Sequence, residues 1–364
     1  MGGGDGPVPG LFGRVRSGRL RAGSRILMSL QVTPRLLATG LAVHPLGVGC
    51  RAIGDTPRGH AVTSDRQWLD GMRRAVERGA TLFDTADTYG DGHAERLLGK
   101  VLRESRRQGL NLQVSSKIGH RGSAPHPYAG PHMKHQLEQS LDNLGVDRID
   151  LYVLPTFDFG DNDRYLGGAI QQMRTLQELG YIGAVGLRGP HAEQAGDGGT
   201  SGRFLQLFRL IEPDVVLADF NALTPLIDLD EDEDLFAFAA RHGTGVLITT
   251  PFAGGFLTGR PDRAPSAPRS KGGEILHRLM DPLRQRLGDR PGLLAMAALR
   301  YCLSRGPHTA VLAGFGTPDH VATNFDCLDL ALDAEDLDLI AGIYAQLRCE
   351  LAVRTGEATV GAPV

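Results

Sequence analysis

Residues 80–118 read ATLFDTADTYGDGHAERLLGKVLRESRRQGLNLQVSSKI. Two short apolar runs rich in β-forming residues, at 80–86 and 111–118, enclose a longer segment, 93–109, that is apolar at helical spacing and closed by glycine. A strand, a helix and a second strand in this order predict a unit whose two strands run parallel. The fold is therefore expected to contain a parallel sheet.

The same alternation continues in both directions along the chain. Strand-like runs occur at residues 43–50, 80–86, 111–118, 148–155, 181–188, 213–220, 245–252 and 309–315. Helical patterns lie between them, at 66–79, 93–109, 131–145, 169–180, 233–243 and 292–306. Eight strands with interleaved helices predict an α/β fold, a single-domain (β/α)8 TIM barrel. No GxGxxG motif follows the first strand, which disfavours a doubly wound sheet of the Rossmann type.

The expected barrel covers residues 31–350. Residues 1–30 are rich in glycine and arginine without a sustained apolar period, which predicts a disordered arm. Because Met28 lies just before the first strand-like segment, a start codon placed too early is an alternative reading of this leader. Residues 351–364 are expected to form a flexible C-terminal tail.

Two further segments between strands and helices have a biased composition. The Pro/Gly-rich residues 259–273 follow the seventh strand, where a barrel carries a long active-site loop. The acidic residues 228–234, DLDEDED, predict a solvated loop and the N-terminus of a helix.

Charge and cysteine usage narrow the class of protein. The 364 residues carry a formal net charge of −3, from 39 basic and 42 acidic side chains, so no global positive field would attract nucleic acid or an anionic membrane. No apolar run approaches the roughly 20 residues that span a bilayer, and no secretory signal is present, which predicts a cytoplasmic protein with a small-molecule partner. The four cysteines show no CxxC or Cys/His spacing, so we expect reduced thiols, mostly buried, and no zinc site. Nothing in the sequence decides the oligomeric state.

Three polar residues stand at or just after predicted strand ends, where the chemistry of such a barrel is located. Asp84 ends the second strand, Tyr89 follows in the next loop, and Lys117, one of only four lysines, ends the third strand. An ammonium held by a carboxylate lowers the pKa of a neighbouring phenol, so the three together are expected to make a proton donor or acceptor. A structural ion pair beside a packed tyrosine is the alternative.

The motif around these residues resembles a known family. Residues 79–102, GATLFDTADTYGDGHAERLLGKVL, are similar to the GxxxxDTAxxYGxxxxExxLG signature of the aldo-keto reductases. SSKIG (115–119), SLDNLGVDRIDLYVL (140–154), TTPFAGGFLTGR (249–260) and GFGTPDHVATN (314–324) resemble further landmarks of this family, in the same order. The resemblance spans roughly residues 35–345.

The resemblance implies a (β/α)8 barrel, NADPH as cofactor, and reduction of a carbonyl with Tyr89 as the acid, tuned by Lys117 and Asp84. Glu95 and Gly99 would belong to the adjoining helix packing. It also implies cofactor binding by Pro251, Phe252, Gly254, Gly255, Leu257, Arg260, Gly314, Thr317 and Asn324. Arg188 departs from the family pattern and is predicted to supply new charge to the cofactor.

The chain departs from the family pattern at the catalytic histidine. Pro155 stands at its position, and proline can neither donate a hydrogen bond nor relay a proton. Asp158, Asp161 and Asp163 in the following loop are candidates to replace the histidine, with a solvated loop as the alternative. Histidines 93, 120, 126, 132 and 135 lie near the same loops without ligand spacing, so we predict no metal site.

Further departures concern the cofactor. Arg188-Gly189 replaces a Ser-Asn pair, Leu217 replaces a glutamine, and Gly316 stands where an arginine often binds the 2′-phosphate. His320 and Thr323 replace a Gln and a Glu. NADPH is therefore expected to bind weakly, in an altered pose, or not at all.

Three functions remain open from the sequence. The first is an NADPH-dependent reductase that acts on a carbonyl or enone of a small substrate, sugar-like or from secondary metabolism. The second is a lyase, isomerase or cyclase that keeps Asp84, Tyr89 and Lys117 as its acid/base set without hydride transfer. The third is a non-catalytic relative that binds a ligand or a partner protein.

Overall fold

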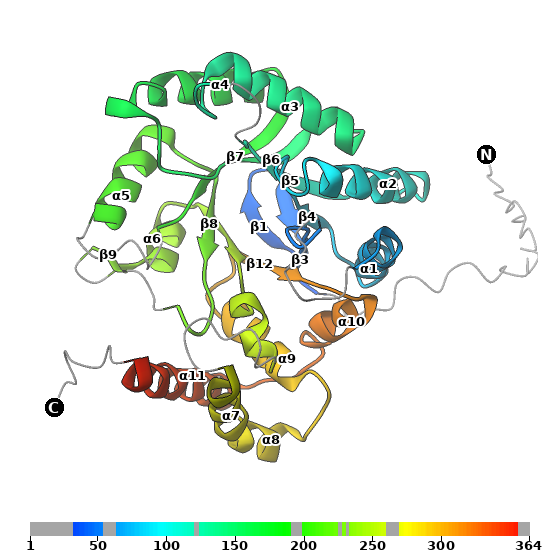
Figure 1. The fold of residues 1–364 in the computed structure, drawn as a ribbon, viewed down its shortest axis with the longest axis vertical. Coiled ribbons are helices and arrows are strands. Elements are labelled where there is room, and N and C mark those ends of the chain that lie inside the picture. Colours follow the sequence, from blue (N-terminus) through cyan, green and yellow to red (C-terminus); the bar gives the residue numbers. More distant parts are fainter. Residues whose placement is uncertain are drawn as a thin grey trace, which may run out of the picture.

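The computed structural model describes residues 32–53, 63–119, 124–190, 199–224, 228–230, 233–259 and 269–355. Eight parallel strands close into a barrel in the order β11-β12-β3-β4-β5-β6-β7-β8 (Figure 1). These are β3 (Leu46–Gly49), β4 (Leu82–Asp84), β5 (Gln113–Lys117), β6 (Ile149–Leu154), β7 (Ile182–Arg188), β8 (Val215–Asp219), β11 (Gly245–Thr249) and β12 (Thr309–Gly314). Each strand lies within one of the eight predicted runs, so the barrel prediction is confirmed.

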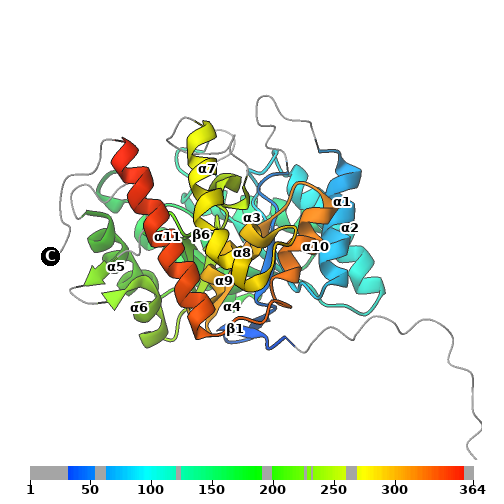
Figure 2. The ribbon, with the colours of Figure 1, turned by 90° about the horizontal axis from the view of Figure 1, so that it is seen from below.

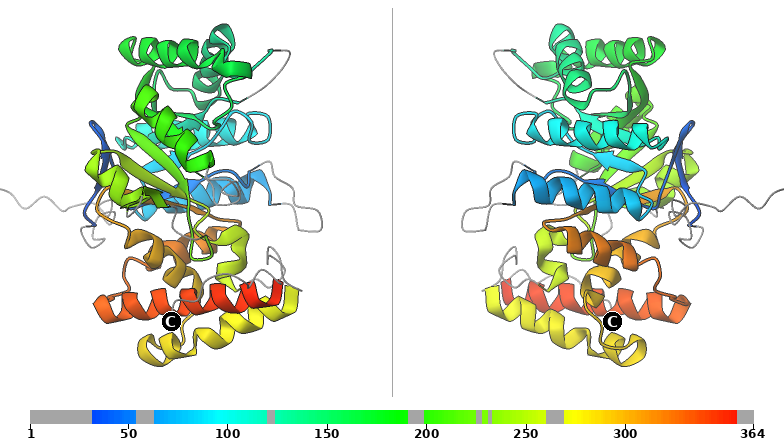
Figure 3. Two further views of the ribbon diagram at one scale, coloured as in Figure 1. Left: turned by 90° about the vertical axis from the view of Figure 1, so that its left-hand side faces the viewer. Right: turned by 90° about the vertical axis from the view of Figure 1, so that its right-hand side faces the viewer.

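Helices surround this barrel (Figures 1 and 2). They are α1 (Asp65–Glu77), α2 (His93–Arg107), α3 (Gly130–Leu144), α4 (Leu166–Glu178), α5 (Gly199–Ile211), α6 (Leu235–Arg241), α9 (Leu293–Leu303) and α10 (Pro318–Asp326). Three more, α7 (Arg269–Leu279), α8 (Asp281–Leu287) and α11 (Ala334–Thr355), lie together on one side of the molecule (Figure 3).

Helix α1 illustrates how the sequence specifies these helices. The Ser64 side chain accepts a hydrogen bond from the Gln67 backbone N–H, and the Gln67 side chain accepts one from the Ser64 N–H. This capping box satisfies two of the unpaired backbone donors at the helix start. Trp68 in this helix is buried and meets Phe315 edge-on, with 5.2 Å between ring centroids.

Alternate residues of the barrel strands face the barrel axis and fill its interior. Their side chains form one buried apolar cluster of Leu82, Leu151, Val153, Ala184, Val215, Leu217, Leu247, Ala310 and Leu312. The hairpin of β1 (Arg35–Ala38) and β2 (Leu41–Val43) adds Leu37, Leu41 and Val43 to the cluster and closes the N-terminal end of the barrel. A Cβ at Gly245 would lie 2.3 Å from the Leu37 carbonyl oxygen, so the close approach of the hairpin requires glycine there.

The same alternation defines the residues at the opposite end. Strand pairing places Asp84 beside Ser115, Lys117 beside Val153, and Asp219 beside Thr249. Two residues beyond the inward-facing Leu82, Leu217 and Leu247 stand Asp84, Asp219 and Thr249, and Arg188 stands four residues beyond Ala184. Lys117 ends β5 at the same edge. The C-terminal mouth of the barrel is therefore polar, above an apolar interior.

Two segment predictions need correction. Helix α11 extends to Thr355 because Leu351 packs against the core, so residues 351–355 are helical rather than a flexible tail. In the acidic segment, β9 (Asp228–Asp230) pairs with β10 (Glu233–Asp234), and Leu229 between the acidic residues is buried, so this part is not simply a solvated loop. Its helix N-terminus is confirmed, because Asp234 accepts hydrogen bonds from two backbone N–H groups of α6.

Other predictions fall partly outside the described residues. The leader, residues 1–30, and the end of the tail, residues 356–364, lie outside them. Of the Pro/Gly-rich segment 259–273, residues 260–268 are not described, whereas helix α7 begins at Arg269. The four cysteines are unpaired, with Cys50, Cys302 and Cys327 buried and Cys349 exposed. Among the described helices, none is both long and apolar enough to cross a membrane.

Candidate active site

The Asp84–Lys117 pair lies at the mouth of the barrel, at the ends of β4 and β5. The Lys117 Nζ is 2.7 Å from both carboxylate oxygens of Asp84 and donates a further hydrogen bond of 2.8 Å to the Thr85 carbonyl. The Ser115 hydroxyl donates to Asp84 Oδ1 at 2.8 Å. Only 5% of the Asp84 side chain and 12% of the Lys117 side chain are exposed. The ammonium is thus fixed by acceptors on two consecutive residues at the end of β4.

Tyr89 stands over this pair, on the loop between β4 and α2. The Lys117 Nζ lies 5.2 Å from the centre of the Tyr89 ring. Asp87 anchors the loop, because its Oδ2 accepts a hydrogen bond of 3.0 Å from the Gly119 N–H after β5. A Cβ at Gly119 would lie 2.1 Å from Asp87 Oδ1, so this close approach requires glycine. The structure brings together the three residues predicted to carry the chemistry.

The protonation of these groups follows from their burial. Burial raises the pKa of Tyr89 above its ordinary value; the charge of Lys117 lowers it and that of Asp84 raises it, with a net increase. The predicted decrease in the Tyr89 pKa is therefore wrong: Lys117 acts in the expected direction, but desolvation outweighs it. Burial lowers the pKa of Lys117, yet Asp84 and Tyr89 more than offset this, so that pKa is also raised. At neutral pH the site holds a protonated phenol beside an ammonium.

Behind β5, a buried polar network joins the barrel to α2 and α3. Glu95 is fully buried and accepts hydrogen bonds from the Ser116 hydroxyl at 2.9 Å and from the Asn143 amide at 3.0 Å. A Cβ at Gly99 would lie 2.6 Å from the Asn143 carbonyl oxygen. Glu95 and Gly99 therefore serve the helix packing that the resemblance implied.

Pro155 directly follows β6. The loop after it packs against a cluster of aromatic side chains. The Thr156 N–H donates to the Tyr128 hydroxyl at 3.1 Å, and that hydroxyl donates to the Thr156 carbonyl, also at 3.1 Å. The His126 ring stacks on Tyr165, with 4.6 Å between centroids. Pro155 thus begins a packed loop at the position where the resemblance implies a catalytic histidine.

The acidic residues considered as replacements have other contacts. Asp163 is bound by the Arg203 guanidinium of α5, with one contact of 2.8 Å. Asp158 accepts a hydrogen bond from the Gly160 N–H at 2.8 Å and lies 3.6 Å from the His126 Nε2. Asp161 is exposed at the start of the short 3-10 helix Asp161–Asp163. Asp158 and Asp163 thus hold the loop itself.

A second polar set lies on β7, β8 and β11. The Arg188 Nη2 donates to Asp219 Oδ2, and the Thr249 hydroxyl donates to Asp219 Oδ1. The sequence predicted a role for Arg188 but missed Asp219 and Thr249. The signal that could have found them is their position, two residues after buried, inward-facing leucines.

The segment after β11 has an unusual backbone. Thr250, Ala253, Gly254 and Gly255 all have positive φ, from 48° to 102°, before and within the short helix η3 (Ala253–Thr258). A Cβ at Gly254 would meet nothing within 4 Å, so the backbone borders open space there. The Ala253 and Gly255 N–H groups donate to the Thr250 and Phe252 carbonyls within the turn, so the exposed Gly254 is the part of its backbone that suits an anion.

Not every residue predicted in this segment faces that space. The Leu257 side chain is fully buried in the core, and its N–H donates to the Phe252 carbonyl, so Leu257 holds the turn and is not a direct ligand contact. Pro251 is buried and Phe252 partly buried. Arg260 lies outside the described residues.

The start of α10 brings together the remaining predicted residues. Thr317 caps the helix by accepting a hydrogen bond from the His320 N–H, and Pro318 occupies the first turn. The Asn324 side chain donates to the Gly314 carbonyl at 3.1 Å. The Gly316 N–H donates to the His320 ring. Gly314, Thr317 and Asn324 thus form one corner beside the end of β12.

The sequence model of the Aldo/keto reductase family matches residues 45–345. This chain belongs to the aldo-keto reductase family. Among curated relatives, it is 23% identical to L-galactose dehydrogenase of Arabidopsis thaliana over 85% of this chain and 93% of that protein. It is 25% identical to D-threo-aldose 1-dehydrogenase of Pseudomonas sp, over 86% and 96% respectively.

Solved structures agree with the fold of this aldo-keto reductase. Glycerol dehydrogenase from Gluconobacter oxydans superposes with a TM-score of 0.69 at 19% identity, covering 92% of this chain and 99% of that one. An aldo-keto reductase from Klebsiella pneumoniae in complex with NADPH superposes with a TM-score of 0.62 at 21% identity, covering 86% and 96%. The relatives are oxidoreductases, and this chain is an enzyme of that type.

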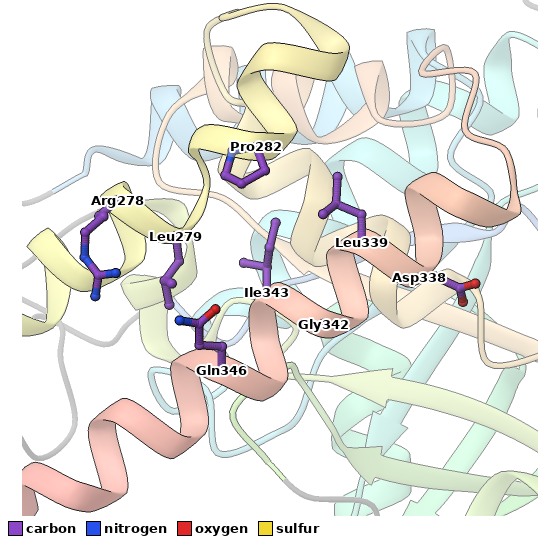
Figure 4. A pocket seen from close by; sticks show the side chains of 8 residues that line it. All are labelled: Arg278, Leu279, Pro282, Asp338, Leu339, Gly342, Ile343 and Gln346. Carbon is purple, nitrogen blue, oxygen red and sulfur yellow. The ribbon is translucent and has the colours of Figure 1, made fainter.

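The residues of this aldo-keto reductase fit a dinucleotide. The open turn at Gly254 suits a diphosphate, and the polar side chains of Thr317 and Asn324 lie in the corner beside the end of β12. A separate groove lies on the outside of the barrel, where Leu339 and Ile343 of α11 face Pro282 of α8 (Figure 4). That groove contains none of the predicted site residues.

Proposed function

We propose that this aldo-keto reductase uses NADPH to reduce a carbonyl group of a small, sugar-like substrate, with Tyr89 as the general acid. The observation that carries the proposal is the buried Lys117–Asp84 pair beneath Tyr89 at the barrel mouth. The names of two relatives, an L-galactose and an aldose dehydrogenase, favour a sugar-like substrate over the enones and secondary metabolites that the sequence left open.

The cofactor would lie along one side of the mouth. The exposed backbone at Gly254 would bind its diphosphate, and the corner of Gly314, Thr317 and Asn324 would hold its adenosine end. When bound, NADPH would supply a hydride to the carbonyl carbon. The chain itself supplies the proton and the electrostatic setting.

Tyr89 delivers that proton. Because burial keeps the pKa of Tyr89 above its ordinary value, the phenol is protonated at neutral pH and can donate to the carbonyl oxygen of the substrate. The phenolate that remains lies beside the Lys117 ammonium, which stabilises its charge. Asp84 and Thr85 hold that ammonium in place, so little reorganisation is needed during the reaction.

A kinetic experiment tests the role of Tyr89. NADPH consumption is followed at neutral pH with a panel of aldoses and small aldehydes, for the unaltered protein, Tyr89→Phe and Tyr181→Phe. Removing the Tyr89 hydroxyl should lower turnover roughly 10²-fold or more, the scale of general acid catalysis, with little change in stability. Tyr181 is 44% exposed and lies before β7, at the other end of the barrel, so its variant should retain full activity.

Two outcomes would count against the proposal. Near-native turnover of Tyr89→Phe would remove Tyr89 from the chemistry. Conversion of a substrate without NADPH consumption would replace reduction by a non-redox reaction that uses the same acid.

A further inference from the structure

The polar set Arg188, Asp219 and Thr249 is built from three consecutive barrel strands. Asp219 is the centre, since its two oxygens accept hydrogen bonds from the Arg188 guanidinium and the Thr249 hydroxyl. The Arg188 and Asp219 side chains are 35% and 27% exposed. They are therefore held in place by each other while remaining accessible from the barrel mouth.

The position of the set relates it to both parts of the proposed site. Around the barrel, β6 with Pro155 at its end separates Lys117 on β5 from Arg188 on β7. On the other side, Thr249 is followed directly by the turn that contains Gly254. A dinucleotide whose diphosphate rests on that turn extends its reactive end past Thr249 and Asp219 toward Tyr89.

The chemistry of the set selects the group that it binds. A guanidinium only donates hydrogen bonds and a carboxylate only accepts them. A charged ligand group would be attracted by one of the two side chains, Arg188 or Asp219, and repelled by the other. The two electrostatic contributions to its binding would therefore largely cancel. The set instead suits a neutral group that presents an acceptor and a donor side by side. A primary carboxamide has this arrangement.

We propose that Arg188 and Asp219 bind the carboxamide of the nicotinamide ring, with Thr249 as a positioning residue. Arg188 donates to the carboxamide oxygen, Asp219 accepts from its NH2 group, and the Thr249 hydroxyl fixes the Asp219 carboxylate. This inference rests on the proposed use of a nicotinamide cofactor. The side chain of Leu217, which lies on β8 two residues before Asp219, is buried and apolar and cannot make these hydrogen bonds.

Calorimetry on the unaltered protein tests the inference without measuring activity. The ligands are NADP+, its 3-acetylpyridine analogue, which lacks the NH2 donor, and its nicotinic acid analogue, which places a carboxylate opposite Asp219. The 3-acetylpyridine analogue loses the hydrogen bond to Asp219, and the nicotinic acid analogue places its negative charge beside that of Asp219. Each should therefore bind about tenfold more weakly than NADP+.

A single substitution should reverse the preference for NADP+ over its nicotinic acid analogue. Asp219→Asn leaves the Arg188 charge without its partner, so the nicotinic acid analogue should then bind more tightly than NADP+. Asp214→Asn is the matched control, because Asp214 precedes the same strand and bonds the Val185 N–H at the opposite end of the barrel. Its analogue preference should equal that of the unaltered protein. Thr249→Val, which replaces the hydroxyl with a methyl group, provides a second variant and should reduce the discrimination between the three dinucleotides.

The possible failures are distinguishable. Equal affinity of the unaltered protein for all three dinucleotides would overturn the inference while leaving cofactor use intact. An Asp219→Asn variant that changes all three affinities by one factor would also overturn it. If no dinucleotide binds, the proposed function fails as well.

Discussion

At the scale of single residues, burial determines the proton chemistry of the mouth. Tyr89 and Lys117 both have raised pKa values, one chiefly through desolvation and the other through its carboxylate partner. Both therefore remain protonated over the neutral range. The neighbouring Cys50 thiol takes no part in this proton chemistry. Burial raises the pKa of Cys50 to about 12, so the thiol stays un-ionised at neutral pH.

Pro155→His tests the most pronounced departure from the family pattern. Position 155 lies two residues beyond Val153, which pairs with Lys117, so a histidine there would add a hydrogen-bond donor near Tyr89. We expect the kcat for small aldehydes to rise about tenfold or more, since a second donor would stabilise charge on the carbonyl oxygen. Steady-state kinetics at saturating NADPH measures this. Unchanged or lower kcat would show that the mouth is shaped for chemistry that does not use this donor.

The sequence was sufficient to find Asp84, Tyr89 and Lys117, because each stands at or just after a recognisable strand end. It was not sufficient for Asp219 and Thr249, whose partnership depends on the register of β8 against β11. The direction of the Tyr89 pKa shift also depends on how closely the surrounding loops pack. Neither quantity is encoded in the local pattern.

At the scale of secondary-structure elements, close backbone contacts position the site. Helix α2 carries Glu95 and packs so tightly on the C-terminal end of α3 that no side chain fits at Gly99. The Glu95–Ser116 hydrogen bond then ties α2 to β5, the strand that ends at Lys117. The packing of α2 therefore helps to hold β5, and with it Lys117, in place.

Gly99→Ala should accordingly destabilise the protein. The new methyl group would lie 2.6 Å and 2.8 Å from backbone oxygens of Asn143 and Leu144, so the free energy of unfolding should fall by about 1–3 kcal/mol. Gly168→Ala in α4 is the matched control, because nothing lies within 4 Å of its Cβ, and alanine there should leave stability equal or about 0.5 kcal/mol higher. Urea unfolding measures both. Equal effects of the two substitutions would contradict the packing described for α2 and α3.

The barrel strands were predictable because each is a short apolar run bounded by turns. The β1–β2 hairpin was not, since its contribution to the core comes from only Leu37, Leu41 and Val43. The end of α11 was also missed, because the burial of Leu351 depends on contacts with the rest of the core. Such long-range contacts decide where an element ends.

At the scale of the whole molecule, the closed barrel buries groups that resist ionisation. Burial raises the pKa values of Cys50 and Cys327 from ordinary values near 9 to about 12. In the unfolded chain these thiols ionise above about pH 9, while in the folded protein they stay protonated. The folded state then binds more protons, so the free energy of unfolding falls as pH rises from about 9 toward 12.

Cys50→Ala should reduce this pH dependence. Urea unfolding at pH 8 and pH 10.5 should show a smaller loss of stability in the variant, by up to about 1.4 kcal/mol for each pH unit above 9. Cys349→Ala removes an exposed thiol and should retain the full loss. If Cys50→Ala shows the same loss as the unaltered protein, the Cys50 thiol does not contribute to it.

We propose that this barrel binds a nicotinamide cofactor despite the departures from the family pattern at Pro155, Arg188 and Leu217. Titration of the purified protein with NADPH, followed by cofactor fluorescence or calorimetry, tests it most directly. The intact turn at Gly254 and the corner at Gly314, Thr317 and Asn324 predict saturable binding of one NADPH per chain with a dissociation constant below about 1 mM. Absence of saturable binding up to millimolar NADPH would show that the barrel does not bind this cofactor.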